Sequence, residues 1–198
     1  VKCNEPFPPD INDLVRLHKL IRERKVFTIL EFGIGYSTII MADALLKNKL
    51  EFEQKNITNI RNNEFKICSI DSVKEWINIF RENYKSFTNL FELIELCYSD
   101  VKIGTFNDRI CSYYEKLPDI IPDFIYLDAP DPVSVKGNIN GITFKNKTIN
   151  AADILLMEPL LIPGCYIIVD GRSNNSRFLK NNFQRKFKYT NNKEDDIS

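Results

Sequence analysis

Short hydrophobic runs alternate along this chain with segments in which apolar residues recur every three or four positions. The runs predict buried strands, and the recurring positions predict amphipathic helices. The predicted strands cover residues 26–32, 65–71, 91–98, 123–128 and 165–170. The predicted helices cover residues 37–48, 107–116, 151–158 and 174–182, together with one capped by Asp10 or Asp13 and one opened by the capping box Ser72-Val73-Lys74-Glu75.

This alternation predicts the fold class. Strands that alternate with helices form a parallel sheet with right-handed crossovers, so we expect an α/β, doubly wound, mostly parallel sheet with helices on both faces. A chain of 198 residues suffices for one such domain. Within it we expect a lead-in and helix over residues 1–25, a surface insertion over 49–64, a long irregular loop over 129–147 and a candidate sixth strand over 185–189.

Composition and charge limit the classes of partner that we expect and the cell compartment. The 27 basic and 27 acidic residues balance, so no net field draws nucleic acid or an anionic membrane. No apolar run reaches the roughly 20 residues that span a bilayer, and the N-terminus lacks a signal pattern. We therefore expect a cytoplasmic protein that binds neither nucleic acid nor membrane. The five scattered cysteines, without a Cys-x-x-Cys pair, predict buried thiols.

A carboxylate ends or follows each predicted strand. Because the carboxyl ends of parallel strands meet at one edge, these side chains converge there. Carboxylates placed together repel one another and raise each other's pKa, so the edge suits a ligand with cations, hydroxyls or a metal better than a pyrophosphate. Each acid alone could instead cap a turn. The five residues are Glu31, Asp71, Asp100, Asp128 and Asp170.

A turn with two glycines, Gly33 and Gly35, joins the first strand to the next helix. The turn is similar to the dinucleotide fingerprint, but Thr38 stands where that motif has its third glycine. The acid that ends the second strand, Asp71, follows Gly33 by 38 residues, whereas the fingerprint expects about 20. A carboxylate at that place can hold both hydroxyls of a ribose. The turn therefore predicts a ribose-bearing ligand and leaves its identity open.

The ordered set of motifs resembles the class I S-adenosylmethionine-dependent methyltransferases, nearest to small-molecule O-methyltransferase-like members. The resemblance covers residues 26–172 and implies a Rossmann-like fold, S-adenosylmethionine as cofactor and methyl transfer to a small-molecule acceptor at oxygen. It rests on the segments Leu30–Thr38, Ser69–Asp71, Ser99–Asp100, Asp123–Asp128 and Pro163–Asp170.

The resemblance also implies roles for single residues. Glu31 and the glycine turn would face the methionine part of the cofactor, Asp71 its ribose, and Asp100 with Ser99 its adenine. The charges agree, because this cofactor brings an ammonium, a sulfonium and two ribose hydroxyls to an acidic edge. The full implied cofactor-binding set is Glu31, Gly33, Gly35, Ser37, Thr38, Asp71, Ser72, Ser99, Asp100 and Asp128.

Asp128 and Asp131 are the catalytic candidates, as a base or as groups that orient the acceptor. With Asp170 they resemble the metal-holding acids of catechol-type O-methyltransferases, in which Mg²⁺ lowers the pKa of the acceptor hydroxyl. Two departures keep metal-free use open: Asp131 stands where that subfamily has Lys, and Gly171 where it has Asn.

Two further features have more than one interpretation. The loop 129–147 is the best candidate for a lid over the acceptor, and its lysines, Lys136, Lys145 and Lys147, either meet an anionic acceptor or are solvated. His18, on the apolar face of the first helix, is either a packed side chain or a catalytic base.

Two alternative functions stay open. The segment Asp128-Ala129-Pro130-Asp131-Pro132 is similar to the D-x-x-D-P segment of aminopropyltransferases of the spermidine synthase type. A non-catalytic S-adenosylmethionine-binding module or inactive partner subunit would carry the same pocket. The ends add two expectations: residues precede Val1, and the antiparallel strand that usually closes this family's sheet is either cut off after Ser198 or replaced by another chain, as in a homo-oligomer.

Overall fold

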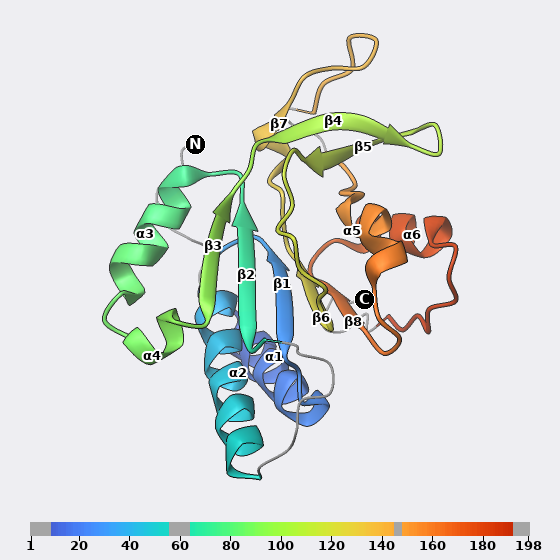
Figure 1. The fold of residues 1–198 in the computed structure, drawn as a ribbon. Helices are drawn as coiled ribbons and strands as arrows, with labels where there is room; N and C mark the ends of the chain where they lie inside the picture. Colours follow the sequence, from blue (N-terminus) through green and yellow to red (C-terminus); the bar gives the residue numbers. More distant parts are fainter. Residues whose placement is uncertain (1–8, 56–63, 145–147, 192–198) are drawn as a thin grey trace.

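The computed structural model describes residues 9–55, 64–144 and 148–191, and its centre is a five-stranded parallel sheet in the order β3-β2-β1-β6-β8 (Figure 1). The order reverses beside β1, as doubly wound sheets do at their switch point. All five predicted strands are confirmed, each slightly shorter than predicted. They are β1 (Thr28–Phe32), β2 (Lys66–Asp71), β3 (Ile94–Tyr98), β6 (Phe124–Leu127) and β8 (Tyr166–Val169).

Helices cover both faces of this sheet, so the predicted fold class is confirmed (Figure 1). Alternate strand residues face opposite sides: Ile29 packs with α1 and α2, whereas Leu30 packs on the side of α5 and α6. α1 begins after its predicted cap, since Asp10 accepts the Asn12 N–H at 2.8 Å. The helices are α1 (Ile11–Arg24), α2 (Tyr36–Gln54), α3 (Lys74–Tyr84), α4 (Thr88–Phe91), α5 (Asp153–Met157) and α6 (Ser173–Asn182).

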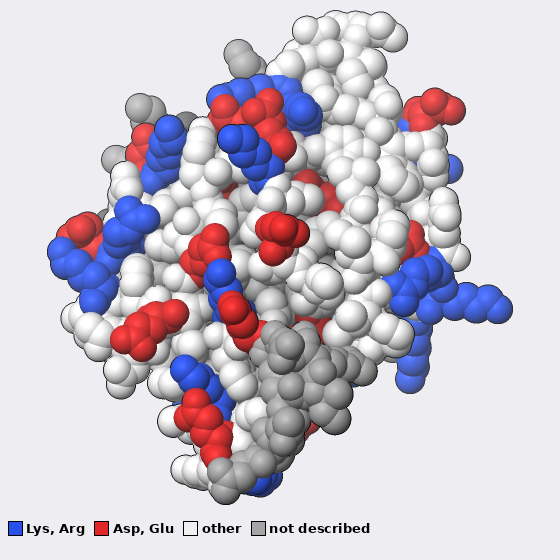
Figure 2. All heavy atoms as spheres, viewed as in Figure 1, with Lys and Arg blue, Asp and Glu red and all other residues white. Residues whose placement is uncertain are grey.

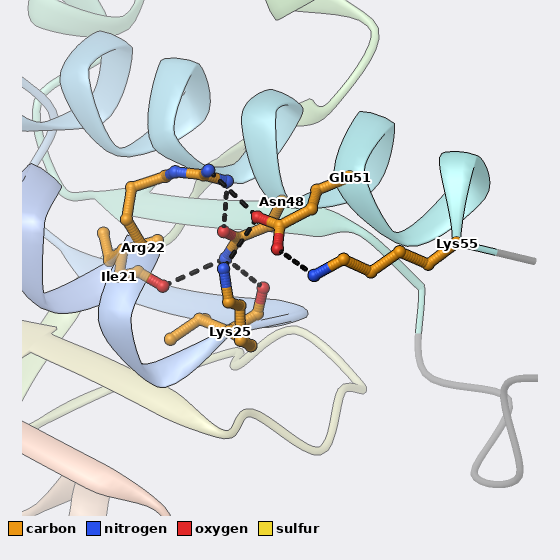
Figure 3. Close-up of polar contacts among 7 residues, drawn as sticks. Ile21, Arg22, Lys25, Asn48, Glu51 and Lys55 are labelled. Carbon is orange, nitrogen blue, oxygen red and sulfur yellow. Dashed lines mark hydrogen bonds and ion pairs between the residues drawn. The ribbon is translucent and has the colours of Figure 1, made fainter. Parts of the chain in front are cut away.

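A polar cluster fastens the end of α1 to α2 just before β1 begins (Figure 3). The buried Asn48 donates from Nδ2 to the carbonyls of Ile21 and Val26, both at 3.0 Å, and accepts from Arg22 Nη1 at 2.7 Å. One turn later, Glu51 meets Lys25 at 2.7 Å, and this pair, with Lys55, lowers the pKa of Glu51. The carbonyls at the end of α1 therefore have partners where water is excluded.

The helix predicted over residues 107–116 is wrong. The segment belongs to an antiparallel hairpin of β4 (Val101–Phe106) and β5 (Arg109–Tyr114), and β4 also pairs with the short β7 (Val135–Lys136). Asn107 and Asp108 form its two-residue turn, with φ of 47° and 61°. A hairpin turn of this kind needs two left-handed residues, which Asn and Asp tolerate.

Smaller corrections concern caps and edges. Ser72 does not form the predicted capping box: Val73 is the residue before α3, and its N–H donates to Asp71 Oδ1 at 2.8 Å. The sixth strand predicted over residues 185–189 is absent from the described part of the chain; instead, the Arg185 N–H donates to the buried Glu158 carboxylate at 2.6 Å.

Several predictions fall partly outside the described residues. α2 runs to Gln54, through the start of the predicted insertion 49–64, whose residues 56–63 lie outside them. The loop 129–147 contains β7 and a short 3-10 helix, Pro132–Ser134, while Lys145, Lys147 and Cys3 are not described. The four described cysteines are free thiols, two buried and two half-buried. No helix in the described ranges is long and apolar enough to cross a membrane.

Candidate functional site

Glu31, at the end of β1, is completely buried beneath the glycine turn. Its Oε1 accepts from the Ser37 hydroxyl at 2.5 Å, and its Oε2 accepts from Thr38 at 2.6 Å and Ser69 at 2.5 Å. Burial raises the pKa of Glu31 to about 7, while the three hydroxyls oppose the shift. Both carboxylate oxygens are therefore engaged inside the protein. Glu31, Ser37 and Thr38 organise the turn together. The predicted position of the Glu31 carboxylate was the open edge of the sheet, whereas the structure turns it into the protein.

The two glycines of the turn have different surroundings. Gly33 has φ +103°, and a Cβ built there would lie 3.1 Å from the Ala129 Cβ, so the turn passes directly against the chain that leaves β6. Gly35 precedes α2, and a Cβ there would meet nothing within 4 Å. The Gly35 N–H donates to Thr38 Oγ1 at 3.1 Å, which fixes the turn without filling the space in front of it. A ligand can approach the backbone at Gly35.

Asp71 links the glycine turn to the end of β2. Its Oδ2 accepts the Ile34 N–H at 3.0 Å and its Oδ1 accepts the Val73 N–H at 2.8 Å. The side chain is only 8% exposed; burial raises the pKa of Asp71, the backbone donors oppose the shift, and the charge of Asp131 adds to it. The structure thus brings Asp71 and the glycine turn together, as predicted, and holds the carboxylate in one orientation.

Ser99 and Asp100 follow β3, and the side chains of both interact with other groups of the protein. The buried Ser99 hydroxyl accepts the Lys116 N–H at 2.9 Å. Asp100 pairs with Lys136 Nζ at 2.8 Å and accepts from the Tyr98 hydroxyl, and Lys136 holds the pKa of Asp100 below its usual range. Lys136 therefore joins β7 to the end of β3, which neither of its predicted interpretations anticipated.

Asp128, at the end of β6, is open to solvent on one side and surrounded by protein on the others. This partial desolvation raises the pKa of Asp128 to about 6; the charge of Asp170 adds to the shift and Arg172 opposes it. Arg172 is half-buried and donates from Nη2 to the Pro130 carbonyl at 2.6 Å. A carboxylate with this pKa can accept a proton near neutral pH.

The predicted metal ligands do not form a metal site. Asp131 caps the 3-10 helix, accepting the Val133 N–H at 3.0 Å. Asp170 accepts from the Tyr126 hydroxyl and lines a groove against α1 beside Asp13. Within the described ranges no group of three or more His, Cys, Asp or Glu side chains is placed to hold a metal ion. Asp128, Asp131 and Asp170 are therefore not arranged as a three-carboxylate site for Mg²⁺.

His18 lies between α1 and α2, where its Nε2 is 2.7 Å from Asp43 Oδ2. Asp43 also pairs with Lys47 at 2.6 Å. This arrangement ties two helices together and favours the packed interpretation of His18 over the catalytic one.

Two side chains at this edge were not singled out from the sequence. Arg172 supplies a positive charge beside Asp128. Tyr114, at the end of β5, is 4% exposed, and its hydroxyl has no hydrogen-bond partner within the described ranges. Tyr114 was hidden by the mistaken helix over residues 107–116. The Asn107-Asp108 pair between two apolar segments was the signal that could have revealed the hairpin.

On the face that Figure 2 presents, Lys, Arg, Asp and Glu side chains are interspersed, and no broad area of one sign appears. Small clusters of opposite charge lie side by side over the helices and the hairpin. This face has no continuous basic surface of the kind that follows a phosphate backbone.

Comparisons with known proteins give structural likenesses only. No family model and no curated protein matches the chain. A solved structure from Klebsiella pneumoniae, described as an O-methyltransferase, has TM-score 0.49 and 18% identity, and the match covers 87% of this chain and 61% of that one. The O-methyltransferase TomG from Streptomyces achromogenes, solved with SAM, has TM-score 0.48 and 16% identity over 85% and 60%.

A third structure, the O-methyltransferase from Bacillus cereus with SAH, has TM-score 0.48 and 18% identity, and the match covers 91% of this chain and 66% of that one. The chain spans less than two thirds of the length of each of these proteins. At these TM-scores and identities, the likenesses do not establish a family. The function therefore has to be argued from the site.

Proposed function

We propose that this chain is one methyltransferase domain that uses S-adenosylmethionine and transfers a methyl group to the oxygen of a small-molecule acceptor. The observation that carries the proposal is the pair formed by the open backbone at Gly35 and the fixed Asp71 carboxylate. That carboxylate accepts from the backbone N–H groups of Ile34 and Val73, with a further backbone contribution from Ser72, and it keeps lone-pair capacity for a ribose hydroxyl.

The charges at the edge suit this cofactor. Asp71 and Asp128 both have a raised pKa, chiefly because burial disfavours the charged carboxylate, and nearby carboxylates add to the shift, so positive charge at this edge would stabilise both. A ligand with an ammonium and a sulfonium supplies that charge, whereas a phosphate would add to the repulsion. Ser72, Ser99 and Asp100 flank the same strand ends and complete the proposed cofactor-binding set with Gly33, Gly35 and Asp71.

When bound, S-adenosylmethionine supplies an electrophilic methyl group that can be displaced in line. The chain must then orient the acceptor and take its proton. Asp128 is the proposed base, because its raised pKa leaves it ionised at neutral pH yet able to hold a proton taken from the acceptor hydroxyl. Arg172 would keep Asp128 oriented and partly neutralised, and Asp131, fixed as a helix cap, is the proposed acceptor-orienting group.

Calorimetry with S-adenosylmethionine and its demethylated product tests the proposal. We expect both to bind, and we expect Asp71→Ala to weaken binding by about 1 to 3 kcal/mol, because the ribose hydroxyls lose a charged partner. The exposed Asp119 offers a control in Asp119→Ala.

Other outcomes separate the remaining functions. Absence of binding to either compound would remove the cofactor. Unchanged affinity in Asp71→Ala would remove this residue from the site. Binding without turnover across a broad panel of hydroxyl acceptors would favour a non-catalytic module, and binding of only the decarboxylated cofactor would favour aminopropyl transfer.

A further inference from the structure

The hydroxyl of Tyr114 is buried where the strands of the central sheet end, and it has no hydrogen-bond partner among the residues that the structure describes. The hairpin fixes the residue from several sides. The Tyr114 N–H donates to Asp153 Oδ1 at 2.8 Å, Tyr114 pairs with Val101 across the hairpin, and the next residue, Glu115, donates its N–H to the Asp100 carbonyl at 2.8 Å. The side chain is therefore held in place by its backbone, with its hydroxyl taking no part.

The ring of Tyr114 places this hydroxyl beside the glycine turn. It packs against Phe32, the residue before Gly33, with ring centroids 5.7 Å apart. The charges of Asp71, Asp153, Arg172 and Asp128 all act on it. Burial raises the pKa of Tyr114 well above its ordinary value, and the nearby carboxylates add to this, so the hydroxyl stays neutral and offers one O–H donor and two lone pairs.

A phenylalanine would fill the same space without a stranded polar atom. Burial of a hydroxyl without a partner costs free energy, because the hydrogen bonds it makes in water are lost and not replaced. Buried polar groups in folded proteins usually have partners, so an exception marks a position where a bound ligand can supply one.

We propose that the Tyr114 hydroxyl hydrogen-bonds the S-adenosyl cofactor when it binds at the glycine turn. The inference rests on the proposed function. It assigns the hydroxyl to the cofactor rather than to the acceptor, because the ring packs against Phe32 beside the glycine turn, and the charge of Asp71, the residue proposed to hold the ribose, acts on the hydroxyl more strongly than that of Asp128. Tyr114 then completes the site from the hairpin, an element on which none of the sequence-predicted site residues lies.

The neighbouring Tyr113 provides a matched control. It is on the same strand, but its hydroxyl donates to the Thr105 carbonyl at 2.8 Å and is therefore already satisfied. Tyr113→Phe and Tyr114→Phe each remove one phenolic oxygen from β5. They differ in whether that oxygen has a partner in the free protein.

The test measures S-adenosylhomocysteine affinity by calorimetry and the unfolding temperature of the ligand-free protein, for the wild type and both variants. We expect Tyr114→Phe to weaken affinity by about 5- to 20-fold, in line with the loss of one hydrogen bond to a ligand, without lowering the unfolding temperature of the free protein. Tyr113→Phe should leave affinity within about twofold and lower the unfolding temperature slightly.

Three outcomes would overturn the proposal. If the wild type binds and Tyr114→Phe binds equally well, the hydroxyl does not contact the cofactor, and the proposed function stands. If Tyr114→Phe destabilises the free protein more than Tyr113→Phe does, the hydroxyl has a structural role. If the wild type binds neither S-adenosylmethionine nor S-adenosylhomocysteine, the proposed function fails and this inference fails with it.

Discussion

The two halves of the strand-end edge differ in how their charged groups are satisfied. On the half formed by β1 and β2, the Glu31 carboxylate receives three hydroxyl donors and Asp71 receives two backbone N–H donors. On the half formed by β6 and β8, Asp128 is balanced mainly by the charge of Arg172. The first half is fixed by short hydrogen bonds, and the second depends on the charges that face it.

This difference suggests a division of labour at the proposed site. Groups that are already hydrogen-bonded in the free protein lose little freedom when a ligand arrives, which favours binding. Asp128 has a raised pKa and, unlike the fully buried Glu31, is open to solvent, so it can exchange a proton with an acceptor near neutral pH, which favours chemistry. We therefore expect substitutions in the first half to change stability or cofactor affinity. Both Glu31 and Asp128 make stability depend on pH, and comparing an Asp128 variant with the wild type isolates the part due to Asp128.

The strongest test of the first half is Glu31→Ala. It leaves the hydroxyls of Ser37, Thr38 and Ser69 buried without their acceptor, so we expect the free energy of unfolding to fall by about 3 kcal/mol. Chemical denaturation measures this. Glu53→Ala, at an exposed position on α2, is the control and should change stability by less than about 0.5 kcal/mol. Equal effects of Glu31→Ala and Glu53→Ala would show that the hydrogen bonds from the three hydroxyls to Glu31 do not stabilise the turn.

Gly33→Ala tests the backbone of the same half. The substitution forces a side chain into φ +103° and places its Cβ 3.1 Å from Ala129, so we expect a loss of about 2 kcal/mol in the free energy of unfolding. Gly164→Ala has a similar φ of +89° without any neighbour within 4 Å. Gly164→Ala therefore measures the backbone conformational cost alone, and its free energy of unfolding should fall by about 1 kcal/mol. A Gly33 variant no worse than the Gly164 variant would argue against the close contact.

Gly35→Ala separates binding from stability. Its Cβ would enter open space at an extended backbone, so we expect the free energy of unfolding to change by less than about 0.5 kcal/mol. The same methyl group would occupy the space proposed for the cofactor and weaken S-adenosylhomocysteine affinity by about tenfold, or about 1.4 kcal/mol. Calorimetry and denaturation on one preparation measure both. Unchanged affinity would place the cofactor elsewhere.

Asp128→Asn tests the second half. Because the pKa of Asp128 is about 6 in the folded chain and lower when unfolded, the folded state binds more protons between about pH 4 and 6, and stability falls as pH rises through that range. The variant does not lose stability in this way and should be more stable than the wild type by about 1 kcal/mol at pH 7.5. This is less than the whole pKa shift of Asp128 implies, because the side chain is open to solvent.

Below about pH 4 the Asp128→Asn variant and the wild type should agree, because the carboxyl is protonated in both states. Unfolding curves at pH 3.5 and pH 7.5 provide the measurement. A stability difference that does not depend on pH would show that Asp128 is an ordinary surface acid.

The strands of the sheet could be predicted from the sequence, because buried strands leave continuous apolar runs and amphipathic helices leave a period of three to four residues. The hairpin was not predicted, because its turn depends on two left-handed residues, Asn107 and Asp108. Polar and apolar residues alternate too weakly in the segment after them to exclude a helix. The strand-end acids could be placed on one edge, since strand order alone brings them there.

The orientation of those acids could not be predicted. Glu31 turns inward because its partners come from positions six and seven residues later and from Ser69 on another strand. Only the register between β1 and β2 brings Ser69 alongside Glu31. The isolation of the Tyr114 hydroxyl likewise depends on Phe32 and the hairpin packing together. Such contacts join distant parts of the chain and leave no periodic signal.

The close approach of Gly33 to Ala129 makes these two positions mutually restrictive in size. A larger side chain at position 129 would press on the glycine turn, and a larger one at position 33 would press on the start of the loop 129–147. Changes in that loop that alter its first residues are therefore felt at the turn that receives the proposed cofactor. Under the proposed function, substitutions at the start of this loop and at the glycine turn are therefore coupled in their effects on the cofactor site.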